Sequence, residues 1–150
     1  MLVASFYTPA GIYPALAARL AASCDRFGVR HAVEEMPDTG DLKTSNNQKP
    51  RYILDLLQDY REPILWLDAD CEIVKPIPVV PPSVDFAAFN WYADPENSLG
   101  LPVNLQRLKS SGGVLYFGYT PAAIELLSHW TRAVIDHPGV VDDVLLDGCF

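Results

Sequence analysis

The sequence has little positive charge and no long apolar run. Eleven Lys and Arg residues stand against 19 Asp and Glu residues in a chain of 150, which gives a formal net charge of −8. A surface of that sign repels nucleic acid and anionic membranes, and we find no basic patch that would offset it, so neither is an expected partner. No apolar run approaches the roughly 18 residues that a transmembrane helix needs, so no such segment is expected.

Cysteine is also scarce. Cys24, Cys71 and Cys149 are an odd set and lack the Cys-x-x-Cys spacing of many zinc sites. This disfavours a disulfide framework and favours a reducing compartment, so we expect a cytoplasmic protein. A length of 150 residues and a hydrophobic content of 49% suit one folded domain, residues 1–150.

Strands and helices are predicted to alternate along the chain. Apolar runs at residues 2–7 and 31–36 and from Ile64 onward are typical of strands, and apolar residues recur at helical spacing after Pro14 and Pro50. This order predicts an α/β sandwich. Further strands are expected at residues 85–91 and 114–119, with a long polar loop at 93–111 between them and a helix opened by Thr120 and Pro121.

The apolar run that begins at Ile64 leads straight into Asp68, Ala69 and Asp70. Residues two apart on an extended strand point the same way, and ligands of such sheets bind at the carboxyl ends of strands. We therefore expect both carboxylates to face one site. Two close carboxylates repel each other, and a divalent cation such as Mg²⁺ or Mn²⁺ that also binds phosphate oxygens would relieve the repulsion. A solvated acidic loop is the alternative interpretation.

Three segments, in this order, resemble the nucleotide-diphospho-sugar transferases of the GT-A glycosyltransferase family. They read NNQKPRYILDLL…EPILWLDADCEIVKPI, SSGGVLYFGYTPAAIELLSHW and VVDDVLL. The resemblance implies a GT-A-like, Rossmann-like α/β fold, with a mostly parallel sheet flanked by helices in three layers. It also implies a metal-dependent, hexosyltransferase-like enzyme that moves a sugar from a nucleotide-diphosphate donor to an acceptor hydroxyl.

The resemblance further implies roles for individual residues. Asp70 would be the direct ligand of Mn²⁺ or Mg²⁺, and Asp68 would bind the metal or the ribose. The remaining nucleotide-sugar-binding candidates are Tyr7, Thr8, Pro9, Lys49, Ser111, Gly112 and Gly113, and the catalytic candidates are Asp142 and Asp143.

The chemistry of these residue types agrees with those roles, although each has a structural alternative. Lys49 stands at a helix start, where backbone N–H groups already favour the phosphate anions it would approach, but it could equally be a surface lysine. Gly112 and Gly113 permit a close approach of sugar and acceptor, or form an ordinary turn. Asp142 and Asp143 could position the sugar and take the acceptor's proton, or simply cap a helix.

The chain departs from the family in one respect and leaves two rival functions open. Many family members carry a further C-terminal segment with a histidine metal ligand, whereas no histidine follows His137 here. The expectation is therefore either a fold truncated at the C-terminus or a minimal version that completes its metal shell with water. A magnesium phosphatase of the haloacid dehalogenase type also has Asp-x-Asp after an apolar strand, and Thr120 could serve as its second motif. Glu72 and the lack of a lysine between Thr120 and Asp142 argue against that enzyme. A catalytically silent nucleotide- or carbohydrate-binding module is the third interpretation.

Overall fold

The computed structural model describes residues 1–93 and 109–150. Its strands are β1 (Leu2–Tyr7), β2 (His31–Glu35), β3 (Ile64–Leu67), β4 (Phe86–Asn90) and β5 (Ser110–Phe117). Its helices are α1 (Tyr13–Arg26), α2 (Leu42–Asn46), α3 (Lys49–Tyr60), α4 (Pro121–Asp136) and α5 (Asp142–Asp147), and a 3₁₀ turn covers Trp91–Ala93. Within these residues, no helix is both long and apolar enough to cross a membrane.

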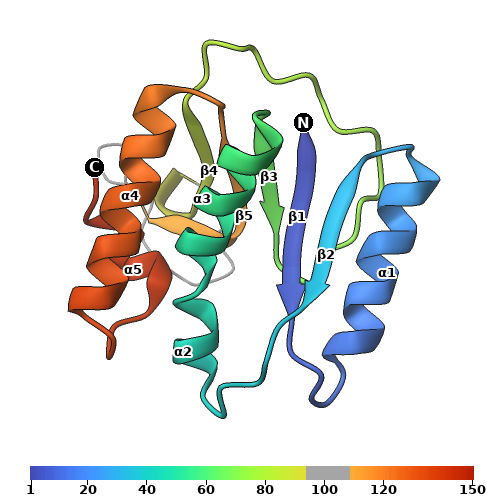
Figure 1. The fold of residues 1–150 in the computed structure, drawn as a ribbon. Helices are drawn as coiled ribbons and strands as arrows, with labels where there is room; N and C mark the ends of the chain where they lie inside the picture. The colour runs from blue at the N-terminus through green and yellow to red at the C-terminus, as the bar shows by residue number, and fades with distance from the viewer. Residues whose placement is uncertain (94–108) are drawn as a thin grey trace.

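The strands form one mixed sheet in the order β2-β1-β3-β5-β4 (Figure 1). β1 pairs in parallel with β2 and with β3, whereas β5 pairs antiparallel with both β3 and β4. Among the described strands, β5 alone therefore runs against the common direction. The prediction of a mostly parallel sheet is confirmed.

Helices cover both faces of the sheet, which gives the predicted three layers. On one face, α1 buries Leu20 and Cys24 against Val3 and Leu67. On the other face, α3, α4 and α5 pack over a larger core. The central side chains of that core are Trp66, Phe117 and Trp130, each of which is at most 1% exposed.

Local signals that were visible in the sequence begin and end several helices. Pro14 lies in the first turn of α1, and Gly28 follows the helix with φ +63°, a left-handed conformation that glycine adopts readily. Thr120 caps α4, where its side chain accepts a hydrogen bond of 3.2 Å from the backbone N–H of Ala123. These elements lie where the sequence predicts them.

The reversed direction of β5 positions the site. Leu67 at the end of β3 lies opposite Val114, so the middle of β5 borders the end of β3 and residues 110–113 continue past it. The backbone N–H of Asp68 continues this pairing by donating to the carbonyl of Gly113 at 2.9 Å. Asp68 and Gly113, which are far apart in the sequence, thus lie side by side at the end of the apolar strand β3.

The predicted geometry of the two acids is wrong in one respect. β3 ends at Leu67, and residues 68–71 form a turn in which the Cys71 N–H donates to the Asp68 carbonyl at 2.9 Å. Asp68 and Asp70 therefore do not leave one face of an extended strand. Helix α2 was also not predicted, and the expected loop at 93–111 lies largely outside the described residues.

Candidate functional site

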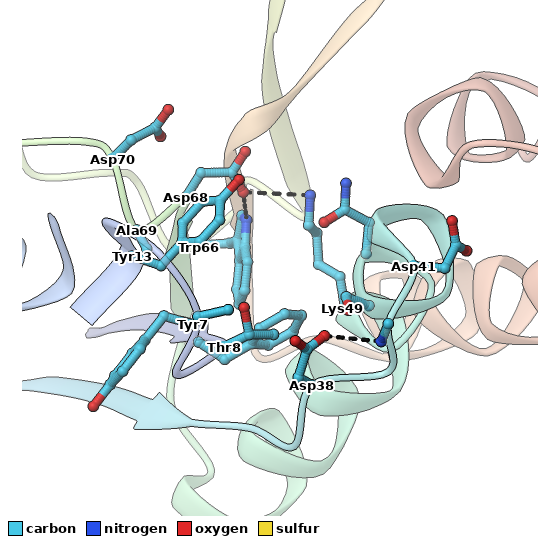
Figure 2. A pocket seen from close by; sticks show the side chains of 15 residues that line it. Tyr7, Thr8, Tyr13, Asp38, Asp41, Lys49, Trp66, Asp68, Ala69 and Asp70 are labelled. Carbon is cyan, nitrogen blue, oxygen red and sulfur yellow. Dashed lines mark hydrogen bonds and ion pairs between the residues drawn. The ribbon is translucent and has the colours of Figure 1, made fainter.

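A pocket of about 420 Å³ opens at the carboxyl ends of β1 and β3, beside the start of α3 (Figure 2). This is the edge at which sheets of this kind bind ligands. β1 and the turn after it contribute Phe6, Tyr7, Thr8 and Ala10, and α1 contributes Tyr13. The remaining lining residues are Asp38, Gly40, Asp41, Ser45, Asn46, Lys49, Trp66, Asp68, Ala69 and Asp70.

The pocket is strongly acidic. Among the described residues that line it, four are aspartates, Asp38, Asp41, Asp68 and Asp70, and one is basic, Lys49. Such a lining attracts cations and accepts hydrogen bonds from hydroxyl groups, but it repels a bare phosphate anion.

Asp68 is held by two side chains from different elements of the fold, Trp66 of β3 and Lys49 of α3. The indole N–H of Trp66 donates to its Oδ1 at 2.8 Å, and the ammonium group of Lys49 lies 3.3 Å from the same oxygen (Figure 2). The Asp68 side chain is still 41% exposed. It is therefore oriented by the protein and open to a ligand at the same time.

Lys49 connects the pocket with α5. Its side chain is 4% exposed, and its Nζ lies 3.0 Å from Oδ2 of Asp142, an ion pair that lacks the alignment of a hydrogen bond. Burial alone would lower the pKa of Lys49, but the carboxylates of Asp68 and Asp142 raise it above its ordinary value. Lys49 is therefore charged at neutral pH.

Asp142 and Asp143, the predicted catalytic pair, occupy different environments. Asp142 is 2% exposed, and burial raises the pKa of its carboxyl group although the Lys49 charge opposes this. Its backbone carbonyl accepts a hydrogen bond of 2.7 Å from the indole of Trp130. The Asp143 side chain is 30% exposed and lies 3.1 Å from Nζ of Lys109. Asp143 is thus the more accessible of the two acids.

A second cluster ties α5 to the start of β5. Lys109 also lies 3.3 Å from Oδ2 of Asp147, and Ser110 donates to Oδ1 of Asp147 through its backbone N–H at 2.9 Å and its hydroxyl at 2.6 Å. α5 is therefore held by Lys49 at its first residue and by β5 at its last.

The predicted glycine pair lies against the acids. A methyl group added at Gly113 would come within 3.2 Å of Oδ2 of Asp68. One added at Gly112 would come within 3.3 Å of Cβ of Asp143 and 3.5 Å of Nζ of Lys49. Small residues are therefore needed where β5 passes the acidic side chains.

The structure divides the predicted site residues into two groups. Tyr7, Thr8, Lys49, Asp68 and Asp70 line the pocket. The other candidates lie outside its lining, although Gly112, Gly113 and Asp142 contact Lys49 or Asp68. The set outside the lining is Pro9, Ser111, Gly112, Gly113, Asp142 and Asp143.

Sequence reasoning missed the pocket wall formed by residues 38–46. Asp38 Oδ1 accepts a hydrogen bond of 2.8 Å from the backbone N–H of Gly40. Asp41 caps α2, because its side chain accepts a hydrogen bond of 2.9 Å from the backbone N–H of Thr44. The hydrogen bonds from Thr44 lower the pKa of Asp41. Asp-x-Gly-Asp directly after a strand could have indicated this turn and helix start. Tyr13, near the start of α1, was also missed.

In the part of the chain that the structure describes, a complete set of protein ligands for a metal ion is not found. Among residues 1–93 and 109–150, no group of three or more His, Cys, Asp or Glu side chains is arranged to hold one. Asp68 and Asp70 nevertheless line the same pocket. Two carboxylates suffice for Mg²⁺ or Mn²⁺ when phosphate oxygens and water complete the shell, so the residues present fit a cation that arrives with a phosphorylated ligand.

Comparison with known proteins bears on the fold. No protein-family model and no curated protein matches the sequence. Solved structures do match, among them the crystal structure of a glycosyltransferase involved in the glycosylation of the major capsid of PBCV-1. The TM-score is 0.66 at 18% sequence identity, and the match covers 91% of this chain and 68% of that chain. The chain therefore has a glycosyltransferase-like α/β fold.

Proposed function

We propose that this chain binds a nucleotide-diphosphate sugar together with a divalent cation and transfers the sugar to an acceptor hydroxyl. The observation that carries the proposal is the acidic pocket at the carboxyl ends of β1 and β3, in a fold that resembles a glycosyltransferase. A sugar nucleotide offers many hydroxyl donors to these carboxylates. Its diphosphate is the one part that needs a cation here.

Asp68 and Asp70 have different roles in the proposed binding of cation and donor. Asp70 is exposed in the turn after β3, and we assign it to the cation. Asp68, oriented by Trp66 and Lys49, would share the cation or accept a hydrogen bond from a ribose hydroxyl. When bound, the cation would neutralise the charge that builds up on the departing nucleoside diphosphate.

Other side chains would position the donor and the acceptor. Tyr7 at the end of β1, Thr8 directly after it and Tyr13 of α1 would offer aromatic and hydroxyl groups to the base and ribose. We assign the proton-accepting role to Asp143 rather than Asp142, because Asp143 is exposed enough to meet an acceptor.

The test is a binding screen followed by a turnover assay. UDP, GDP and CDP are titrated into the protein by calorimetry with Mn²⁺, with Mg²⁺ and with EDTA. Binding of one of them that EDTA abolishes is the expected result, and the matching sugar nucleotides are then assayed for hydrolysis and transfer. D55A is the control variant, because Asp55 pairs with Arg51 on the exposed face of α3. Failure of all three nucleotides to bind would refute the proposal.

The phosphatase alternative is disfavoured by the sheet. β5 is antiparallel to β3, and Phe117 lies opposite Ile64 at the start of β3. Thr120 therefore follows β5 at the edge opposite Asp68, where it cannot serve a reaction at that acid. Hydrolysis of an aryl phosphate would favour the phosphatase all the same, and nucleotide-sugar binding without turnover would indicate a silent module.

A further inference from the structure

The ammonium group of Lys49 is enclosed by oxygen atoms of the protein. It donates to the Gly112 carbonyl at 3.1 Å, and it lies 3.0 Å from Oδ2 of Asp142 and 3.3 Å from Oδ1 of Asp68. The ring of Trp66 covers it at 5.4 Å from Nζ to the ring centroid. A lysine has three N–H donors, and each of them has an oxygen nearby.

The charge of Lys49 is also balanced within the protein. One ammonium group faces two carboxylates, so the cluster of Lys49, Asp68 and Asp142 carries net negative charge. A lysine that binds phosphate directs unpaired donors and uncompensated charge at its ligand. The charge of Lys49 is compensated by Asp68 and Asp142, and its side chain is only 4% exposed.

The three oxygens around Lys49 belong to three separate parts of the fold. Asp68 lies in the turn after β3, Gly112 in β5 and Asp142 at the first residue of α5, while Lys49 itself begins α3. Asp68 is further restrained by Trp66, and Gly113 lies close to its other carboxylate oxygen. The ammonium group is thus a shared contact of four elements.

We infer that Lys49 is a positioning residue, which fixes the Asp68 carboxylate at the pocket through its link to Asp142 and does not bind the phosphates of the ligand. The link between the elements rests on the contacts alone. The statement about phosphates rests on the proposed function. Two experiments separate these parts.

The first experiment needs no ligand. Urea unfolding is measured for K49M, D142N and the double variant. We expect K49M to lower the midpoint strongly, because it leaves Asp142 buried without a cation, and we expect the double variant to recover much of the loss. K109M is the matched control, since Lys109 also pairs with carboxylates of α5, Asp143 and Asp147, but is partly exposed. Additive losses for K49M and D142N would overturn the link.

The second experiment asks whether Lys49 acts through Asp68. The affinity for the nucleoside diphosphate selected by the screen, with Mn²⁺, is compared between the wild type and K49M/D142N, which have the same net charge. We expect a loss of roughly tenfold, in line with residues that orient a ligating group. The same comparison in a D68N background should show no further loss.

The outcomes are distinguishable from failure of the proposed function. A loss that persists undiminished in the D68N background would mean that Lys49 contacts the ligand itself, which overturns the inference. If the wild type binds no nucleoside diphosphate, the proposed function fails. The inference is then tested by urea unfolding of K49M, D68N and the double variant. Additive losses of stability would overturn it.

Discussion

Replacing Gly113 by alanine should weaken ligand binding while leaving the fold nearly as stable. The added methyl group would lie 3.2 Å from Oδ2 of Asp68, so the carboxylate must move by a few tenths of an ångström. Asp68 is open on its pocket side, with 41% of the side chain exposed, so it has room to do so. The perturbation therefore falls on the position of one acid rather than on the core.

Two opposing effects set the expected stability. Alanine in a strand is ordinarily more stable than glycine by about 0.5–1 kcal/mol. The contact between the added methyl group and Asp68 strains the hydrogen bond that Asp68 accepts from Trp66. This strain offsets a similar amount of free energy. We therefore expect the free energy of unfolding of G113A to lie within about 1 kcal/mol of the wild type.

The effect on binding is expected to be larger. A misplacement of about 1 Å at a site can cost about 100-fold, so a shift of a few tenths should cost roughly three- to tenfold. Urea unfolding and calorimetry with the selected nucleoside diphosphate and Mn²⁺ measure the two quantities. G139A is the matched control, because a methyl group at Gly139 would meet nothing within 4 Å. Wild-type affinity in G113A, or a stability loss well beyond 1 kcal/mol, would refute the reasoning.

Three further predictions concern the cation, a thiol and the anchor of α5. D70A should abolish Mn²⁺-dependent nucleotide binding, measured by calorimetry, and unchanged binding would remove Asp70 from the site. Burial, together with the charges of Asp68 and Asp70, raises the pKa of Cys71 to about 11. The thiol is therefore protonated at neutral pH, and its alkylation at pH 8, followed by mass spectrometry, should be about 100-fold slower than in urea. Equal rates would contradict this. W130F removes the buried donor to the Asp142 carbonyl and should cost about 1–3 kcal/mol, which lowers the melting temperature by roughly 3–10 °C. An unchanged melting curve would show that this hydrogen bond does not stabilise the fold.

Much of the fold follows from local sequence signals. The strands at residues 2–7 and 31–35 and the helices opened by Pro14 and Pro121 lie where hydrophobic spacing and capping residues predict them. The burial of the Ile64–Leu67 strand was equally predictable, and so was the position of the two acids that follow it. These features depend on residues close together in the chain.

Apart from the local turn and helix at residues 38–46, the features that were missed depend on long-range pairing. The turn after β3 begins at Asp68, whose own backbone N–H pairs with Gly113 of an antiparallel strand, which periodicity does not reveal. The contacts of Lys49 join α3 to Asp142, which lies far along the sequence. A lysine at a helix start gives no sign that carboxylates will enclose it. Hydrophobic patterns specify which elements form, but not which side chains meet.

The reversed strand β5 also has a consequence for the order of folding. β1, β2 and β3 pair among themselves using the first half of the chain, but the second edge of β3 stays open until β5 arrives between β3 and β4. Until then a buried, apolar strand presents unpaired backbone groups, which is the condition under which nascent sheets pair with neighbouring molecules. Pairing of β5 with β3 therefore covers an apolar edge that would otherwise be open to other molecules.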